Sequence, residues 1–288
     1  MNFVVTFVNG LSLGGIYAMI ALGYTMVYGI AKMLNFAHGD IIMVGAYTIV
    51  VFATFNPIIA ILAAIVMCMI FGVVIEKVAY KPLRGSSPLA VLITAIGVSY
   101  LLQCIAQIIF GTQSKSAAIP NLGTLQIGPI SLKISTIITL VCSVVIMVSL
   151  NFFIKYSKTG RAMIAVSEDK GAAQLMGINV NVIIMITFAI GSALAAVAGL
   201  FKILDGENVQ TTFGALPGIK AFTAAVIGGI GSIPGAMIGG ILLGIIESIS
   251  LSIPQIAPYT NAIEFSMLII ILLVKPTGLL GKKRREKV

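Results

Sequence analysis

The segment Lys155–Asn181, KYSKTGRAMIAVSEDKGAAQLMGINVN, interrupts an otherwise apolar chain, and the interpretation of the whole sequence starts from it. Thr159 and Ser167 can each cap a helix, and the two acidic residues after Ser167 favour the positive end of the second helix dipole. Gly177 is a typical stop signal at a helix C-terminus. The segment therefore predicts two short helices outside a membrane, which form a compact knob between two spans.

The composition is that of an integral membrane protein. Hydrophobic residues make up 59% of the 288 residues and charged residues only 9%, whereas about a quarter of a soluble domain is charged. The net charge of +9 would suggest nucleic acid in a soluble chain, but in a membrane protein basic residues mark the side of the membrane. We therefore expect membrane lipid as the environment and no nucleic-acid partner.

Apolar runs of about 20 residues mark the spans. One shorter run, 218–230, remains between two long ones, and we expect it to cross or nearly cross the membrane. The sequence thus predicts an all-α, polytopic membrane protein with one domain, residues 1–288, and about nine membrane segments, one of them short or broken. The eight long runs lie near 8–30, 37–55, 58–80, 88–110, 134–154, 182–204, 235–253 and 258–275.

The basic residues predict the orientation. With the tail 276–288 in the cytoplasm, fourteen of the 18 basic residues fall on the cytoplasmic side, as the positive-inside rule requires. The loop 155–181 is then cytoplasmic, and the N-terminus and the loop 111–133 lie outside. Turn signals around TLQI suggest a small hairpin in that outer loop. Four lysines are left to the outer side: Lys115, Lys133, Lys202 and Lys220.

The stretch Gly228–Gly244, GGIGSIPGAMIGGILLG, contains seven glycines and a proline. In a bilayer, small residues allow helices to approach closely, and a broken helix needs protein or a polar cavity around its free backbone groups. We expect a turn at 231–235 and a close helix contact after it. The glycines assigned to packing are Gly228, Gly229, Gly231, Gly235, Gly239 and Gly240.

Five polar residues inside or beside spans are candidates for a translocation path or gate. Asn35, His38 and Asp40 form a polar turn at the start of a span, and a helix-start turn also explains Asp40. Glu247 and Glu264 lie within spans, where an unpaired charge is costly, and neither has a basic partner at helical spacing. Each could line a path for an ammonium group or make a structural hydrogen bond.

Catalytic and metal chemistry find little support in the sequence. The chain has a single histidine, and its three cysteines lie in apolar runs without metal-ligand spacing. We therefore predict no catalytic residue and no metal site. The sequence also lacks G-x-x-x-x-G-K-[ST], the motif that cradles nucleotide phosphates, so we expect no cofactor bound by this chain.

Several motifs together resemble the smaller permease subunit of the high-affinity branched-chain amino acid ABC importers. They are NGLSLGGIYAMIALGYTMVYGI at Asn9–Ile30, LNFAHGD at Leu34–Asp40, GRAMIAVSEDK within the knob, GIKAFTAAVIGGIGSIPGAMIGGILLGIIE at Gly218–Glu247 and VKPTGLLG at Val274–Gly281. The resemblance implies a bacterial inner-membrane importer with a second related permease, two ATPase subunits that bind ATP and Mg²⁺, and an extracytoplasmic solute-binding protein. Whether the permease pair is a heterodimer or a homodimer stays open.

In this family reading, the knob is the coupling segment on which an ATPase docks. Arg161 would contact the ATPase, the alanines would keep the knob thin, and a large side chain at Ala173 would block docking. The coupling positions implied by the resemblance are Gly160, Arg161, Ala162, Glu168, Asp169, Ala173 and Gly177.

A membrane-embedded enzyme is disfavoured, because one histidine and scattered acidic residues supply no cluster of nucleophile and base. Two function classes remain. The first is an ATP-driven importer of branched-chain or related amino acids that works by alternating access. The alternative is a secondary transporter or channel for a small polar solute, with Asp40, Glu247 or Glu264 as its ion site. Dependence of uptake on ATPase subunits separates the two.

Overall fold

The computed structural model describes residues 3–119, 122–127 and 130–281. A π-helical turn (Glu76–Tyr80) follows helix α3 (Pro57–Ile75), and a 3₁₀ turn (Ala257–Tyr259) precedes helix α11 (Thr260–Val274). The basic residues from Lys282 onward, which contribute to the predicted orientation, lie outside the described part. The elements are α1 (Phe3–Ala31), α2 (His38–Phe52), α3 (Pro57–Ile75), α4 (Pro88–Phe110), β1 (Thr124–Ile127), β2 (Ile130–Lys133), α5 (Ile134–Tyr156), α6 (Lys158–Glu168), α7 (Lys170–Leu175), α8 (Val180–Leu204), α9 (Ala215–Gly228), α10 (Ile233–Ser252) and α11 (Thr260–Val274).

The prediction of an all-α, polytopic membrane protein is confirmed. Seven of the helical segments in the described residues are long and apolar enough to cross a membrane, and α2 and α9 are shorter apolar helices. These nine coincide with the nine apolar runs found in the sequence. Helix α1, with 29 residues, is about 43 Å long at 1.5 Å per residue, which exceeds the hydrocarbon thickness of a bilayer.

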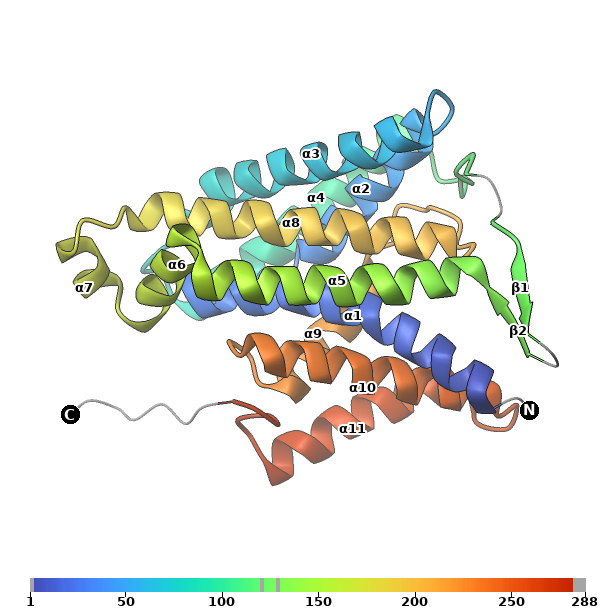
Figure 1. The fold of residues 1–288 in the computed structure, drawn as a ribbon. Coiled ribbons are helices and arrows are strands. Elements are labelled where there is room, and N and C mark those ends of the chain that lie inside the picture. The colour runs from blue at the N-terminus through green and yellow to red at the C-terminus, as the bar shows by residue number, and fades with distance from the viewer. Residues whose placement is uncertain (1–2, 120–121, 128–129, 282–288) are drawn as a thin grey trace.

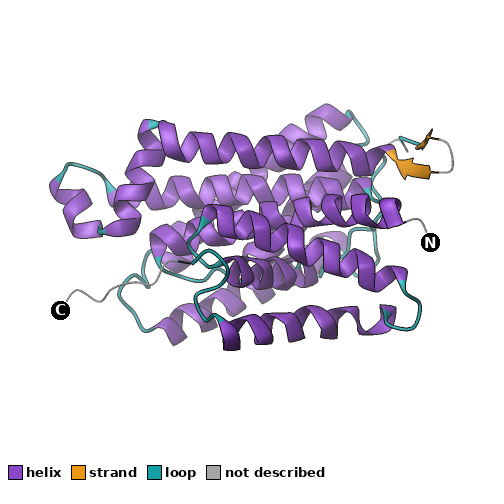
Figure 2. Ribbon diagram, turned by 60° about the horizontal axis from the view of Figure 1, so that its bottom comes forward, coloured by secondary structure: helices purple, strands orange, loops and turns teal. Residues whose placement is uncertain are grey.

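The helices run along one common direction, so the bundle has two distinct ends (Figures 1 and 2). Helices α6 and α7 protrude at one end, and the β1–β2 hairpin lies at the other, where α1 begins. The hairpin is antiparallel, with Thr124 opposite Lys133. A backbone bridge between Lys115 and Val209 ties the same loop to the α8–α9 connection.

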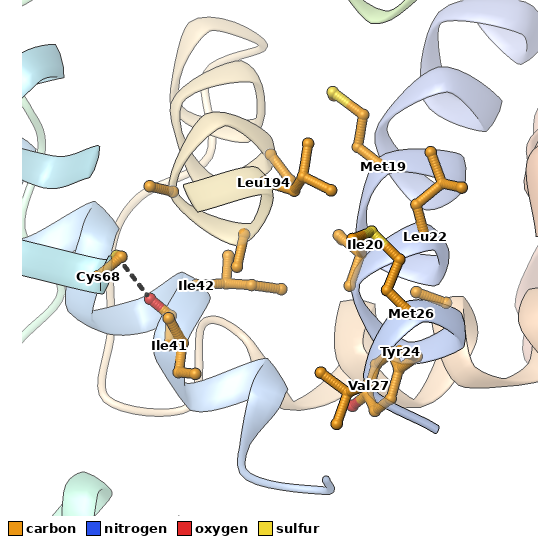
Figure 3. Close-up of a cluster of buried hydrophobic side chains, with 14 of the residues drawn as sticks. Met19, Ile20, Leu22, Tyr24, Met26, Val27, Ile41, Ile42, Cys68 and Leu194 are labelled. Carbon is orange, nitrogen blue, oxygen red and sulfur yellow. Dashed lines mark hydrogen bonds between the residues drawn. The ribbon is translucent and has the colours of Figure 1, made fainter. Parts of the chain in front are cut away.

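Helix α1 forms the centre of the bundle, between α8, α9 and α10. Figure 3 shows the buried side chains of Met19 and Ile20 on the side of α1 that faces Leu194 of α8. In the same region Cys68 is buried, and its Sγ donates to the carbonyl oxygen of Ile41 at 3.3 Å. Small and apolar residues thus fill the core. Because this packing is close, the buried polar side chains of the bundle are held in fixed positions.

Glycines allow α10 to touch two neighbours at backbone distance. A Cβ at Gly240 would lie 2.4 Å from Ala18 Cα of α1, and one at Gly239 would lie 2.1 Å from the Ala224 oxygen of α9. Gly228 and Gly235 face each other across the α9–α10 turn in the same way. The turn comprises residues 229–232 rather than 231–235, because Ser232 already caps α10 through the Gly235 amide.

Two further glycines in this turn have backbone angles that other residues rarely adopt. Gly229 has φ +107° and Gly231 has φ +91°. A Cβ at Gly229 would also lie 2.5 Å from the amide nitrogen of Gly281, whereas Gly231 has no close neighbour. Gly229 is therefore restricted by both conformation and space, and Gly231 by conformation alone.

Candidate functional site

The knob folds as two helices, but their caps differ from the predicted ones. Ser157 caps α6 by accepting from the Gly160 amide at 2.8 Å, and Asp169 caps α7 by accepting from the Ala172 amide at 3.0 Å. Thr159 and Ser167 were the wrong choices, each two residues from the true cap. Glu168 is consequently the exposed last residue of α6 and does not lie in the first turn of α7.

Gly160 sets the sharp corner between α5 and α6. It is buried, and a Cβ there would lie 2.4 Å from both the Cα and the carbonyl oxygen of Ile154. At the other end of the knob, Gly177 adopts φ +82° directly after α7. The amide of Ile178 returns to the carbonyl oxygen of Ala173 at 3.0 Å, which is the hydrogen bond of a left-handed helix stop.

The outward surface of the knob is apolar at its tip. Leu175 is 90% exposed and Met176 is 82% exposed. Ala173 is only 3% exposed, so its side chain faces the permease itself and is not available to an external groove, contrary to our expectation. Arg161 is exposed and Ala162 is half-buried. The tip, not Ala173, therefore presents the surface that another protein can contact.

Lys170 connects α7 to the membrane bundle. Its Nζ donates to the carbonyl oxygen of Ala31 at 3.0 Å, and Ala31 is the last residue of α1. Burial, and then the charge of Arg84, lower the pKa of Lys170 below its ordinary value. The last carbonyls of a helix carry partial negative charge, so an ammonium group is well placed there.

A polar network holds the connection between α1 and α2 at the same end. Asn35 is buried and accepts from the Tyr80 hydroxyl at 2.9 Å. Tyr80 and Glu76 both belong to the π-helical turn, and Arg84 bridges Glu76 to Asn181 at the start of α8. π-helical turns are frequent at functional sites, and this one ties the end of α3 to the α1–α2 connection and, through Arg84, to α8.

His38 and Asp40 are buried in the first turn of α2, but they have different neighbours. The His38 ring packs edge-on against Tyr24 of α1, with centroids 4.8 Å apart. Asp40 accepts from Gln103 of α4, whose Nε2 lies 2.8 Å away. The Nε2 atom of His38 has no hydrogen-bond partner among the described residues, and no metal-ligand cluster occurs among them.

Glu247 and Glu264 share a buried basic partner that the sequence analysis missed. Lys220 of α9 lies with its Nζ 2.7 Å from Glu247 of α10 and 3.2 Å from Glu264 of α11. We had counted Lys220 with the outer-side residues, and the structure places it within α9, where it is only 7% exposed. The structure thus separates the five path candidates into two groups, one at the α1–α2 connection and one around Lys220.

A cavity of about 550 Å³ opens at the hairpin end of the bundle. Hydroxyl groups from α1, α5 and α10 line it, and the surface ion pair between Lys133 and Asp205, 3.1 Å apart, lies at its edge. The hydroxyl-bearing side chains of these helices are Thr6, Ser12, Ser135, Thr136, Thr139, Ser248 and Ser252.

Comparisons with known proteins agree over nearly the full chain. Residues 6–272 match the family described as branched-chain amino acid transport system / permease component. The chain is 43% identical to the high-affinity branched-chain amino acid transport system permease protein BraD of Pseudomonas aeruginosa, covering 98% of this chain and 96% of BraD. It is also 43% identical to the corresponding protein LivH of Escherichia coli K12, covering 97% and 96%.

The fold also resembles a solved structure. The chain aligns with PsaBC from Streptococcus pneumoniae in complex with Fab, with a TM-score of 0.52 over 93% of this chain and 91% of that one. The sequence identity is 15%, so this similarity concerns the fold alone.

Proposed function

Because this chain belongs to the branched-chain amino acid transport system permease family, we propose that partner ATPase subunits drive it by docking on α6 and α7. The chain is a multi-pass membrane permease and the non-catalytic membrane component of an ABC importer for branched-chain amino acids. The single observation that carries this function is the family match over residues 6–272. A self-sufficient secondary transporter or channel is correspondingly disfavoured.

The knob is the proposed docking element, and its apolar tip supports this proposal. Large exposed apolar side chains outside a membrane favour burial against another protein. Leu175 and Met176 are exposed at the C-terminal end of α7, one of the two helices that protrude from the bundle (Figure 1). ATP and Mg²⁺ bind in the partner subunits in this proposal. Nucleotide-driven closure of the ATPases displaces α7, and this displacement switches the bundle between inward- and outward-open states.

Lys170 and the π-helical network provide a route from the knob into the bundle. A displacement of α7 pulls on the last turn of α1 through Lys170 and Ala31. Helix α1 in turn contacts α10 at backbone distance, at Gly240, and its first turns line the outer cavity. A single rigid helix thus joins the docking end to the opposite end of the molecule.

The proposed orientation places the knob in the cytoplasm and the hairpin outside, with the N-terminus outside and the C-terminus inside. A second related permease completes the membrane unit, and an extracytoplasmic solute-binding protein delivers the amino acid. Apolar side chains on the outward faces of the bundle support contact with lipid and with that second permease. Examples of these exposed side chains are Leu62, Ile93, Val148 and Leu273.

The outer cavity is the proposed entry for the amino acid. Its hydroxyl groups can replace water around the ammonium and carboxylate groups of the substrate, and its apolar residues, such as Phe201, can contact the aliphatic side chain. Ligand pockets combine these two kinds of lining. At the edge of the cavity, Lys133 can attract the carboxylate group of the amino acid, and Asp205 can attract its ammonium group.

Uptake by the reconstituted transporter tests the function. Vesicles carry this chain with its permease, ATPase and binding-protein partners, and labelled leucine, isoleucine, valine and urea are compared. We expect ATP-dependent uptake of the three amino acids and none of urea, with no effect of ionophores. Uptake that continues without the ATPase subunits and stops with ionophores would instead establish a secondary transporter.

A further inference from the structure

The cluster of Lys220, Glu247 and Glu264 is unusual because it carries two acids and one base inside a membrane bundle. The three side chains come from α9, α10 and α11, and all three residues are at most 8% exposed. Lys220 contacts both carboxylates, and its Nζ also lies 6.0 Å from the centre of the buried Tyr17 ring of α1. By contrast, the ion pairs Arg84–Glu76, Lys133–Asp205 and Lys202–Glu207 each join one cation to one acid.

The charges of this cluster do not balance if both acids are ionised. One ammonium and two carboxylates leave one net negative charge in a region of low dielectric, and an uncompensated charge is costly there. Two neighbouring carboxyl groups avoid this cost when they share one proton. Tyr17, the other titratable group that faces the cluster, is uncharged as a phenol and does not correct the imbalance.

The contacts within the cluster match a shared proton. Both carboxyl groups contact the same ammonium group, since Lys220 Nζ lies 2.7 Å from Oε1 of Glu247 and 3.2 Å from Oε2 of Glu264. The Oε2 atom of Glu247 is buried and has no hydrogen-bond partner among the described residues. Two carboxylate oxygens cannot hydrogen-bond to each other unless one of them carries a proton.

We propose that Glu247 and Glu264 bind one proton between them, so that the Lys220 cluster is an electrically neutral site. The neutral cluster holds α9 against α10 and α11. It also contains its own ammonium group, so neither acid is a free site for the ammonium group of a substrate. The proposal concerns protonation and is independent of the transported solute.

Infrared spectroscopy of the assembled transporter in lipid tests the proposal directly. A protonated carboxylic acid has a C=O stretching band that a carboxylate lacks. We expect this band in the wild-type protein and its loss in both Glu247→Gln and Glu264→Gln, because each variant leaves one carboxylate opposite Lys220. Asp40→Asn is the matched control at another buried acid, and it should leave the C=O band of the cluster unchanged.

Thermal unfolding of the same proteins provides a second measurement. Each single Gln variant keeps the wild-type unfolding temperature, because the amide replaces a protonated carboxyl of the same shape. The double variant Glu247→Gln/Glu264→Gln unfolds at a lower temperature, because Lys220 is left without a counter-charge. A band that is absent from the wild type or that survives either single substitution overturns the proposal, as does a single variant that is as destabilised as the double one.

Discussion

The ammonium group of Lys170 donates a hydrogen bond to the carbonyl oxygen of Ala31, 3.0 Å away, and so joins the protruding helix α7 to the last turn of α1. These residues are 139 positions apart in the chain. Because α1 contacts α8, α9 and α10 along its length, a force on α7 reaches most of the bundle through this contact. Lys170 is therefore a positioning residue for transport in the proposed mechanism.

Lys170→Met should lower transport while ATPase docking persists. A hydrogen bond from a charged donor contributes about 1.5–3 kcal/mol when buried, and Lys170 is only partly buried, so we expect roughly a fivefold loss of leucine transported per ATP hydrolysed. Lys158→Met is the control, because Lys158 is exposed on α6. If the two variants transport the same amount of leucine per ATP hydrolysed, the contact between Lys170 and Ala31 does not couple ATP hydrolysis to transport.

Gly240→Ala should destabilise the folded protein, whereas Gly97→Ala should not. Both substitutions replace a helical glycine, which by propensity alone gains up to about 1 kcal/mol. At Gly240 the new Cβ would lie 2.4 Å from Ala18 Cα, and at Gly97 no atom lies within 4 Å. Overpacking costs about 1–3 kcal/mol, so the unfolding temperature should fall for Gly240→Ala only. Similar temperatures for both would mean that α1 and α10 separate easily.

The positions of the spans follow from the sequence because the requirement for about 20 apolar residues is local. The partner of Glu247 and Glu264 was not predictable in this way, because Lys220 is 27 and 44 positions away in sequence and packing alone brings it near. The available signal was that Lys220 lies inside the apolar run 218–230, although we counted this lysine with the outer-side residues.

The caps of α6 and α7 show a second limit of the sequence. Ser157 and Thr159 are both good caps, as are Ser167 and Asp169, and local sequence does not choose between them. The choice depends on Gly160, which must lie against Ile154 at the corner of α5. The direction of Ala173 was equally unpredictable, since six residues are too few to define a buried face.

Cysteine labelling tests the proposed orientation. Gln174→Cys lies on exposed α7 and Ser116→Cys on the exposed loop near the hairpin. After Cys104 and Cys142 are replaced by alanine, a membrane-impermeant reagent applied to intact cells should label Ser116→Cys but not Gln174→Cys. The reverse pattern would invert the topology and remove the proposed cytoplasmic docking site.

Lys133→Met should raise the KM of leucine uptake by up to roughly fivefold, because a charge in an exposed ion pair contributes about 1 kcal/mol or less. The measured quantity is the KM of leucine uptake at saturating binding protein. Lys115→Met serves as the control on the same side, because Lys115 does not line the outer cavity. An unchanged KM in Lys133→Met would argue against entry past the Lys133–Asp205 pair.

The docking surface is tested most directly at the tip of α7. Leu175→Ser and Met176→Ser remove the apolar contacts, and Gln174→Ser changes the polar residue beside them. At matched amounts of membrane-inserted protein, we measure co-purification of the ATPase and substrate-stimulated ATP hydrolysis. We predict that the two apolar variants bind the ATPase about tenfold more weakly, equivalent to about 1.4 kcal/mol, while Gln174→Ser resembles wild type. Full association and full stimulated hydrolysis in the Leu175→Ser/Met176→Ser double variant would contradict the claim that α6 and α7 form the docking element.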